Sequence, residues 1–167
     1  MRFLLLISTV LLFTGFRSAD PADECSGDHE ELVDELLGTF TFDNLARVPV
    51  IRHTDGVIVQ EYRYTLFNLP KYRFGIDKKA LGEKGVINIY KRVSRKEKEL
   101  VFTSKGKTDD IVYFSPDPKQ RKYIITVTVP PFCQPGCVLI ALGYKTKNDV
   151  IDQRRPNEGK PRIRVVD

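Results

Sequence analysis

Residues 122–130, KYIITVTVP, decide the fold class of this chain. Side chains of two kinds alternate along the stretch. One face carries Tyr123, Ile125, Val127 and Val129, and the other carries Ile124, Thr126 and Thr128. A period of two is typical of a β-strand that buries one face. Pro130 and Pro131 follow and end the strand, because proline cannot donate a ladder hydrogen bond.

The same alternation recurs through most of the chain after residue 38. It predicts strands at 57–67, 72–76, 86–92, 100–104, 111–114, 123–129 and 138–144, with weaker candidates at 39–42 and 48–52. Turn sequences such as Gly82–Gly85 and the proline-containing loop Ser115–Gln120 separate them. The sequence lacks the continuous apolar runs that are typical of the strands of a parallel sheet. The pattern favours an all-β fold, an antiparallel jelly-roll-like β-sandwich of seven or more strands.

One short helix is predicted before the strands, over Asp28–Leu37. Asp28 and Glu31 have the spacing of a capping box. A stripe of apolar side chains follows at helical spacing: Leu32, Val33, Leu36 and Leu37. Gly38 is a natural stop.

The first nineteen residues indicate export. Arg2 precedes an apolar segment, Leu4–Phe13, and Ala19 offers a small residue for cleavage, although Arg17 fits that site poorly. The segment is too short to span a bilayer. We therefore expect a secreted or periplasmic protein without a transmembrane segment in the mature chain.

The chain divides into four predicted parts. They are a signal peptide (1–19), an acidic leader with the short helix (20–38), a β-sandwich domain (39–145) and a polar tail (146–167). Within the tail, alternation over residues 163–166 would allow an extra edge strand.

Charge is distributed unevenly between these parts. Residues 20–37 hold eight acidic side chains and no Lys or Arg, whereas residues 38–167 hold 25 basic and 14 acidic ones. The leader is either solvated or lies against the basic body and screens it. Without Arg2 and Arg17 the chain holds 25 basic and 22 acidic side chains, and this net charge of +3 is too small to indicate a nucleic-acid partner.

Three cysteines leave the disulfide pairing open. Cys133 and Cys137 flank a tight-turn sequence, so a local bond between them is the favoured pairing. A bond from Cys25 to Cys137, which would tie the leader to the body, competes with it, and the absence of any bond is the third alternative. The spacing lacks the pattern of a metal site, so neither a metal nor a cofactor is expected.

The densest basic run forms a predicted hairpin turn over residues 91–98. Its candidate contacts to an anionic ligand are Lys91, Arg92, Arg95, Lys96 and Lys98. Such a run is commonly a solvated loop, and it could also contact anionic glycans or lipid headgroups. Only Tyr90 accompanies it as an aromatic residue, which disfavours stacking on nucleic acid.

Residue types that carry catalysis are sparse. His29 and His53 are the only histidines, and both are expected in solvated positions. Glu61 and Asp77 would need a second acid in a cleft to act as a glycosidase pair. Three further carboxylates could bind calcium but favour turns: Asp109, Asp110 and Asp117. Three aromatic side chains could be exposed for sugar binding, although packing roles are favoured: Tyr113, Phe132 and Tyr144.

Four segments together resemble an exported bacterial sandwich module. They are YRFGI (72–76), INIYKR with KELVFTS (87–104), KYIITVTVP (122–130) and GCVLIALGYK (136–145). Over residues 57–144 the pattern resembles the pre-peptidase C-terminal (PPC-like) domain and, more loosely, GOLD-like domains. The resemblance implies a module that binds or spaces and does not catalyse. It carries over no site residue. No protease accompanies the sandwich in this chain, and no membrane helix is expected after it.

We therefore expect a non-catalytic accessory module that binds a protein or cell-envelope partner. A carbohydrate- or polyanion-binding module that uses residues 91–98 is the alternative. A small hydrolase is the least favoured hypothesis.

Overall fold

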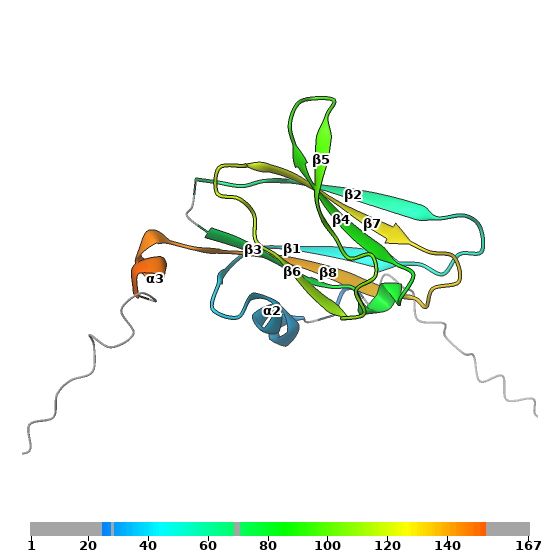
Figure 1. The fold of residues 1–167 in the computed structure, drawn as a ribbon. Helices are drawn as coiled ribbons and strands as arrows, with labels where there is room; N and C mark the ends of the chain where they lie inside the picture. The colour runs from blue at the N-terminus through cyan, green and yellow to red at the C-terminus, as the bar shows by residue number, and fades with distance from the viewer. Residues whose placement is uncertain (1–24, 28, 69–70, 153–167) are drawn as a thin grey trace, which may run out of the picture.

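The computed structural model describes residues 25–27, 29–68 and 71–152 (Figure 1). Eight strands dominate it. They are β1 (Thr41–Val50), β2 (Ile58–Thr65), β3 (Lys71–Asp77), β4 (Val86–Arg92), β5 (Lys98–Thr103), β6 (Ile111–Phe114), β7 (Lys122–Val129) and β8 (Gly136–Lys145). The helical elements are α2 (Glu30–Leu37), a 3₁₀ turn η1 (Lys79–Leu81) and α3 (Lys147–Asp152). No helix among the described residues is long and apolar enough to cross a membrane.

The strands form two four-stranded antiparallel sheets. Sheet A has the order β1-β8-β3-β6, and sheet B has the order β2-β7-β4-β5. The first strand pairs with the last, the second with the seventh, the third with the sixth and the fourth with the fifth. The strand pairs are therefore nested, as in one long hairpin that has the β4–β5 turn at its end and is folded into two sheets. This is a jelly-roll sandwich, as expected.

The core lies between the inner faces of the two sheets. The predicted inner face of β7 is confirmed, since its four alternating side chains from Tyr123 to Val129 are buried. The equivalent side chains of β3 and β8 face them: Tyr72, Phe74, Ile76, Val138, Ile140 and Leu142. Alternation in the sequence thus identified the core correctly.

Helix α2 covers the outer face of sheet A (Figure 1). Its close approach depends on Gly75 in β3, where a Cβ atom would lie 2.5 Å from the Leu36 carbonyl oxygen. Val33, Leu36 and Leu37 pack there against Leu139 and Ala141 of β8. β8 is consequently buried on both faces, which explains its nearly continuous apolar sequence.

The structure corrects the bounds of β2, which ends at Thr65, and of β8, which begins at Gly136, as well as those of β1 and β5. The separate candidates at 39–42 and 48–52 form one strand, β1, in which the pairing with β8 shifts between Phe42 and Asn44. β5 begins at Lys98 rather than at Leu100. In β1 and in β5 the strand continues through polar residues because they lie at a sheet edge and face solvent.

The favoured disulfide, Cys133–Cys137, is wrong. Cys137 is bonded to Cys25, with a Cα–Cα distance of 5.2 Å, and Cys133 is a buried free thiol. Cys137 points to the outer face of sheet A, beside the α2 cluster, whereas Cys133 belongs to the inner core. The bond therefore fastens the segment before α2 onto β8.

Several expectations concern residues outside the described part of the chain. They are the signal peptide, the Asp28 cap and the edge strand over residues 163–166. Helix α2 begins at Glu30, after His29, and ends before Gly38 as predicted.

Candidate binding surface

The basic hairpin, residues 91–98, is the feature that projects most from the sandwich (Figure 1). Its turn is closed by main-chain bonds from Val93 and Ser94 to the Glu97 carbonyl, at 3.1 and 3.2 Å. The Ser94 hydroxyl accepts bonds from the amides of Lys96 and Glu97. An extra residue in β5, Val101, shifts the β4–β5 register below the turn. Such a bulge bends a hairpin, here away from the rest of sheet B.

Three of the five expected basic side chains are held within the fold. Lys91 pairs with Glu99 at 2.9 Å, and Lys98 pairs with Glu61 of β2 at 3.3 Å. Arg92 donates to the main-chain carbonyls of Ser94 and Arg95. These contacts stiffen the hairpin and reduce the charge that it presents to a ligand.

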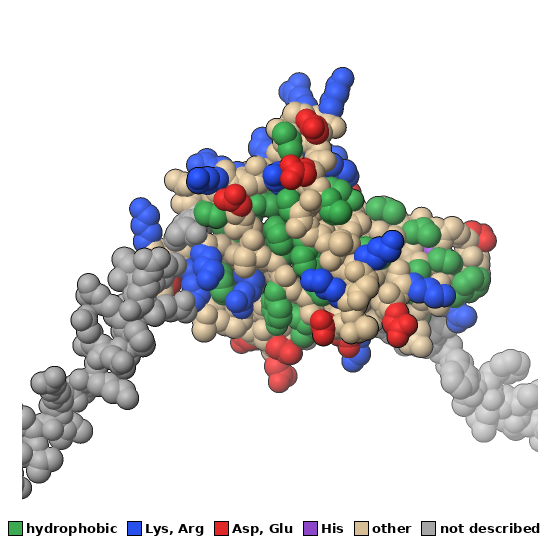
Figure 2. Space-filling model, in the orientation of Figure 1, with side chains coloured by type: hydrophobic (Ala, Val, Ile, Leu, Met, Phe, Trp, Pro, Cys, Tyr) green, Lys and Arg blue, Asp and Glu red, His purple; other side chains and the backbone are tan. Residues whose placement is uncertain are grey.

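The other two basic side chains, Arg95 and Lys96, lie in the turn. Both are exposed and neither forms an ion pair with a described residue. Figure 2 shows Lys and Arg side chains projecting from the end of the hairpin. The predicted basic patch thus divides into a base, where ion pairs neutralise Lys91 and Lys98 and main-chain bonds hold Arg92, and a cationic tip without an ion pair within the described ranges.

A hollow of about 540 Å³ lies at the base of the hairpin. Its lining combines cations, carboxylates and aromatic rings: Lys91, Arg92, Lys119, Glu99, Asp117, Phe114 and Tyr123. The loop that forms one wall is fixed, because the Gln120 amide donates to the Arg92 and Lys122 carbonyls at 3.1 and 2.9 Å. The Tyr123 hydroxyl accepts a bond from the Asp117 amide, and burial raises the pKa of Tyr123. The hollow is therefore a preformed polar depression with an aromatic floor.

The candidate acids for a hydrolase do not come together. Glu61 lies on sheet B, where hydrogen bonds from Arg63 and then Lys98 hold the pKa of its carboxyl below the ordinary value. Asp77 lies on sheet A and accepts the Lys79 amide at 2.9 Å, at the start of η1. A carboxylate with a lowered pKa is a poor general acid at neutral pH.

The remaining polar candidates have local roles. His53 Nδ1 lies 3.3 Å from the Asp55 carbonyl within its own loop, and His29 precedes α2. The expectation of solvated positions is wrong for both, since each ring is half-buried and its Nε2 atom is buried without a hydrogen-bond partner among the described residues. Asp117 accepts the Lys119 amide. Asp109 and Asp110 are exposed, and within the described ranges no three His, Cys, Asp or Glu side chains group as metal ligands.

The three candidate aromatic residues lie apart from one another. Tyr113 of β6 is exposed, with the Arg73 guanidinium 5.5 Å from its ring centre. Phe132 is exposed in the β7–β8 loop, against the favoured packing role, and its φ is +61°. Tyr144 is half-buried against Tyr72. They do not form one platform for a sugar.

One cationic cluster was missed by the sequence analysis. Lys71, Arg73 and Lys145 surround the Phe40 ring, at 5.6, 4.4 and 5.0 Å from its centre. Arg73 also donates to the Leu37 carbonyl at the end of α2. Lys71 and Arg73 are two residues apart in β3, but Phe40 and Lys145 come from distant parts of the chain, so no local pattern indicates the whole cluster.

No family model, curated protein or solved structure matches this chain.

Proposed function

We propose that this protein is an exported, non-catalytic binding module whose basic hairpin contacts an acidic surface on a protein of the cell envelope. The observation that carries the proposal is the division of charge within the hairpin. Ion pairs and main-chain bonds fix its base, while Arg95 and Lys96 remain exposed at its tip. A rigid, cationic projection loses little conformational entropy when it binds.

Export is supported by two features of different kinds. The first nineteen residues have the organisation of a signal peptide. The Cys25–Cys137 bond suits an oxidising compartment, where disulfides persist.

A binding role is supported over catalysis by the contacts of the carboxylates. Glu61 is engaged by two cations, and Asp77 by a main-chain amide. Each therefore has a structural role that explains its presence without a reaction.

An anionic glycan is a second candidate ligand, favoured by the hollow at the hairpin base. Arg92 and Lys119 line it beside the half-buried Phe114 ring. Glu99 and Asp117 also line it, and Glu99 is paired with Lys91. This combination could hold a carboxylated or sulfated sugar, while Arg95 and Lys96 at the tip contact neighbouring sugar units of the same glycan.

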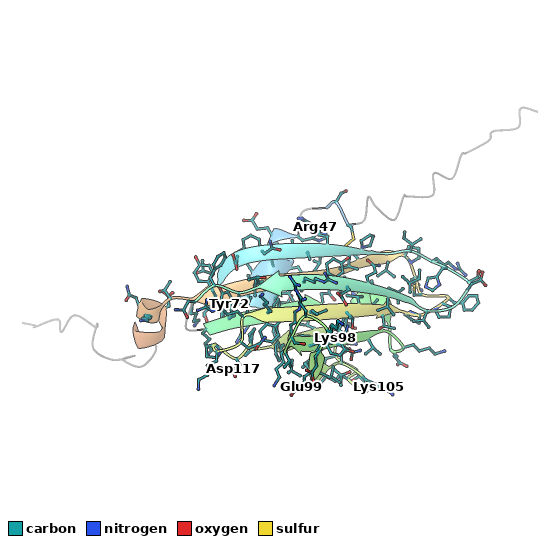
Figure 3. All side chains as sticks on the ribbon, turned by 90° about the horizontal axis from the view of Figure 1, so that it is seen from above. Arg47, Tyr72, Lys98, Glu99, Lys105 and Asp117 are labelled. Atoms are coloured by element: carbon teal, nitrogen blue, oxygen red, sulfur yellow. A yellow bond between two sulfur atoms is a disulfide. The ribbon has the colours of Figure 1, made fainter. Side chains whose placement is uncertain are left out.

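Chromatography at low salt tests whether the hairpin tip binds acidic ligands. The two columns carry immobilised poly-glutamate and immobilised dextran sulfate. We expect the double variant R95E/K96E to elute well before the wild type. The matched control K84E/K105E changes the net charge equally at exposed residues outside the hairpin (Figure 3 labels Lys105). Equal shifts for the two double variants would contradict the proposal, because net charge alone would then explain retention.

A substitution in the hollow distinguishes the two ligand classes. K119E should weaken retention on dextran sulfate and leave retention on poly-glutamate nearly unchanged if the ligand is a glycan. A glycan array at low salt without a single anionic hit would remove the glycan candidate and leave the protein partner.

A further inference from the structure

Strand β2 is an edge strand without a proline, a bulge or a break in its pairing. The other edges are interrupted: β1 contains Pro49 and a register shift, β5 contains a bulge, and β6 has four residues. β2 has eight residues without Pro or Gly, and its pairing with β7 runs unbroken from Ile58 to Thr65. Its outer backbone groups form a row ready to pair with another strand.

The outward side chains of this strand are complementary to themselves. In an antiparallel pair of two β2 strands with the two-fold axis at Tyr62, Glu61 of each copy lies opposite Arg63 of the other. A shift of the axis to Glu61 or to Arg63 would instead place like charges face to face. The order of charges therefore selects one register.

The exposed apolar side chains on and beside β2 also come opposite one another when the two-fold axis passes through Tyr62. Val57 and Phe67, which are 59% and 73% exposed, would face each other across the axis. Val59, 60% exposed, would face Thr65. Apolar side chains at both ends and opposite charges near the centre thus all fit a single pairing.

The inner face of β2 adds an independent observation. The Tyr64 hydroxyl is buried and has no hydrogen-bond partner within the described part of the chain. It lies beside a hollow of about 340 Å³ between the β1 and β2 edges, which Tyr62 and Ala46 also line. In the register centred on Tyr62, the Gln60 amide of the second copy comes opposite Tyr64. A buried hydroxyl without a partner is costly. The Gln60 carboxamide bonds the Pro49 carbonyl and the Tyr62 hydroxyl within its own copy, so it would reach Tyr64 only through its second N–H or its second lone pair.

We propose that two copies of this chain associate through antiparallel β2–β2 pairing about Tyr62, joining their B sheets into one eight-stranded sheet. The site lies beside the hairpin, since Arg95 and Lys96 line a hollow of about 180 Å³ together with Glu61 and Arg63. The pairing would therefore place one basic hairpin next to each half of the joined sheet. Two hairpins on one dimer would raise avidity for a repeated acidic surface.

Charge reversal and charge exchange test the register. Sedimentation over a broad range of concentration should show a dimer for the wild type. R63E places Glu opposite Glu twice per dimer, and it should weaken association at least about tenfold. The exchange E61R/R63E restores opposite charges and should recover wild-type association to within about threefold. The exchange also removes the Glu61–Lys98 contact. The variant K98A is therefore measured alongside, to show how much the loss of this contact alone changes association.

R47E is the matched control, since Arg47 is an exposed cation on β1, on the same long side of the sandwich (Figure 3). It should leave association unchanged. A wild type that stays monomeric throughout would overturn the proposal. So would equal weakening by R47E and R63E, or a folded exchange variant as weak as R63E.

A cross-link gives a second measurement that does not depend on charge. Paired residues at a two-fold axis have Cα atoms about 4.5–5.5 Å apart, which a disulfide can span. Mild oxidation of Y62C should therefore give a covalent dimer, whereas V93C in the exposed hairpin should give little. Equal cross-linking of the two variants would indicate random collision and reject the register.

Discussion

At the residue scale, Glu61 connects two distant parts of sheet B. Its two carboxylate oxygens accept one bond each, from Arg63 in the same strand and from Lys98 at the foot of the hairpin. Lys98 also lies 4.6 Å from the centre of the Tyr90 ring. A single carboxylate thus orients the hairpin relative to the sheet, although its exposure limits its contribution to stability.

The lowered pKa of Glu61 predicts a pH-dependent contribution to stability. Its ordinary pKa is about 4.5, and its contacts hold it lower in the folded chain. The stabilisation is therefore complete above the ordinary pKa and is lost as the pH falls through the lower, folded value. We expect E61Q to cost under about 1 kcal/mol near pH 6, and less near pH 3. Urea midpoints at low salt and dilute protein measure this. An equal cost at both pH values would contradict the assignment.

At the scale of elements, α2 is held on sheet A by a covalent bond and an apolar contact together. The disulfide precedes the helix, and Leu36 seats its other end against Gly75. Arg73 adds a bond to the last turn, where a cation suits the helix dipole. The predicted acidic leader is therefore partly an integral layer of the fold.

Removing the disulfide should loosen this layer measurably. The bond joins residues 112 positions apart, and C25A/C137A should lose about 2–4 kcal/mol of unfolding free energy. Hydrogen exchange should rise first in α2. The control C133A retains the bond and should lose less. Unreduced peptides linking Cys133 to Cys137 in the wild type would refute the pairing.

The elements show which features sequence patterns can predict. β4 occupies the predicted residues because its alternation is clear where one face is wet, and β6 does because polar turns bound its four apolar residues. β1 was split because its middle residues alternate poorly at an interrupted edge. The Cys25–Cys137 bond was predicted only as the competing alternative, because the choice depends on which face of β8 Cys137 occupies. The hairpin was located correctly, yet the acids that neutralise Lys91 and Lys98 depend on strand pairing.

At the scale of the whole molecule, pairing between the two ends of the chain dominates. The β1–β8 pair brings Thr41 beside Tyr144, and the β4–β5 pair alone is local. Forming distant pairs requires the closure of long loops, whose entropy cost slows folding.

The topology therefore predicts slow folding. Refolding from urea should take milliseconds to seconds, as for other sandwiches of this kind. Stopped-flow fluorescence of the tyrosines would follow it. A main phase in microseconds would mean that local contacts dominate, contrary to the strand order.

The order of strands also bears on how such a chain is made. Synthesis produces β1 first and its neighbour β8 last, so sheet A cannot close until residue 145 has left the ribosome. A chain that must thread through a membrane channel benefits from staying unfolded during passage. The strand order of the jelly roll delays closure of sheet A, and for the export that we propose it would keep the polypeptide competent for translocation until β8 has been synthesised.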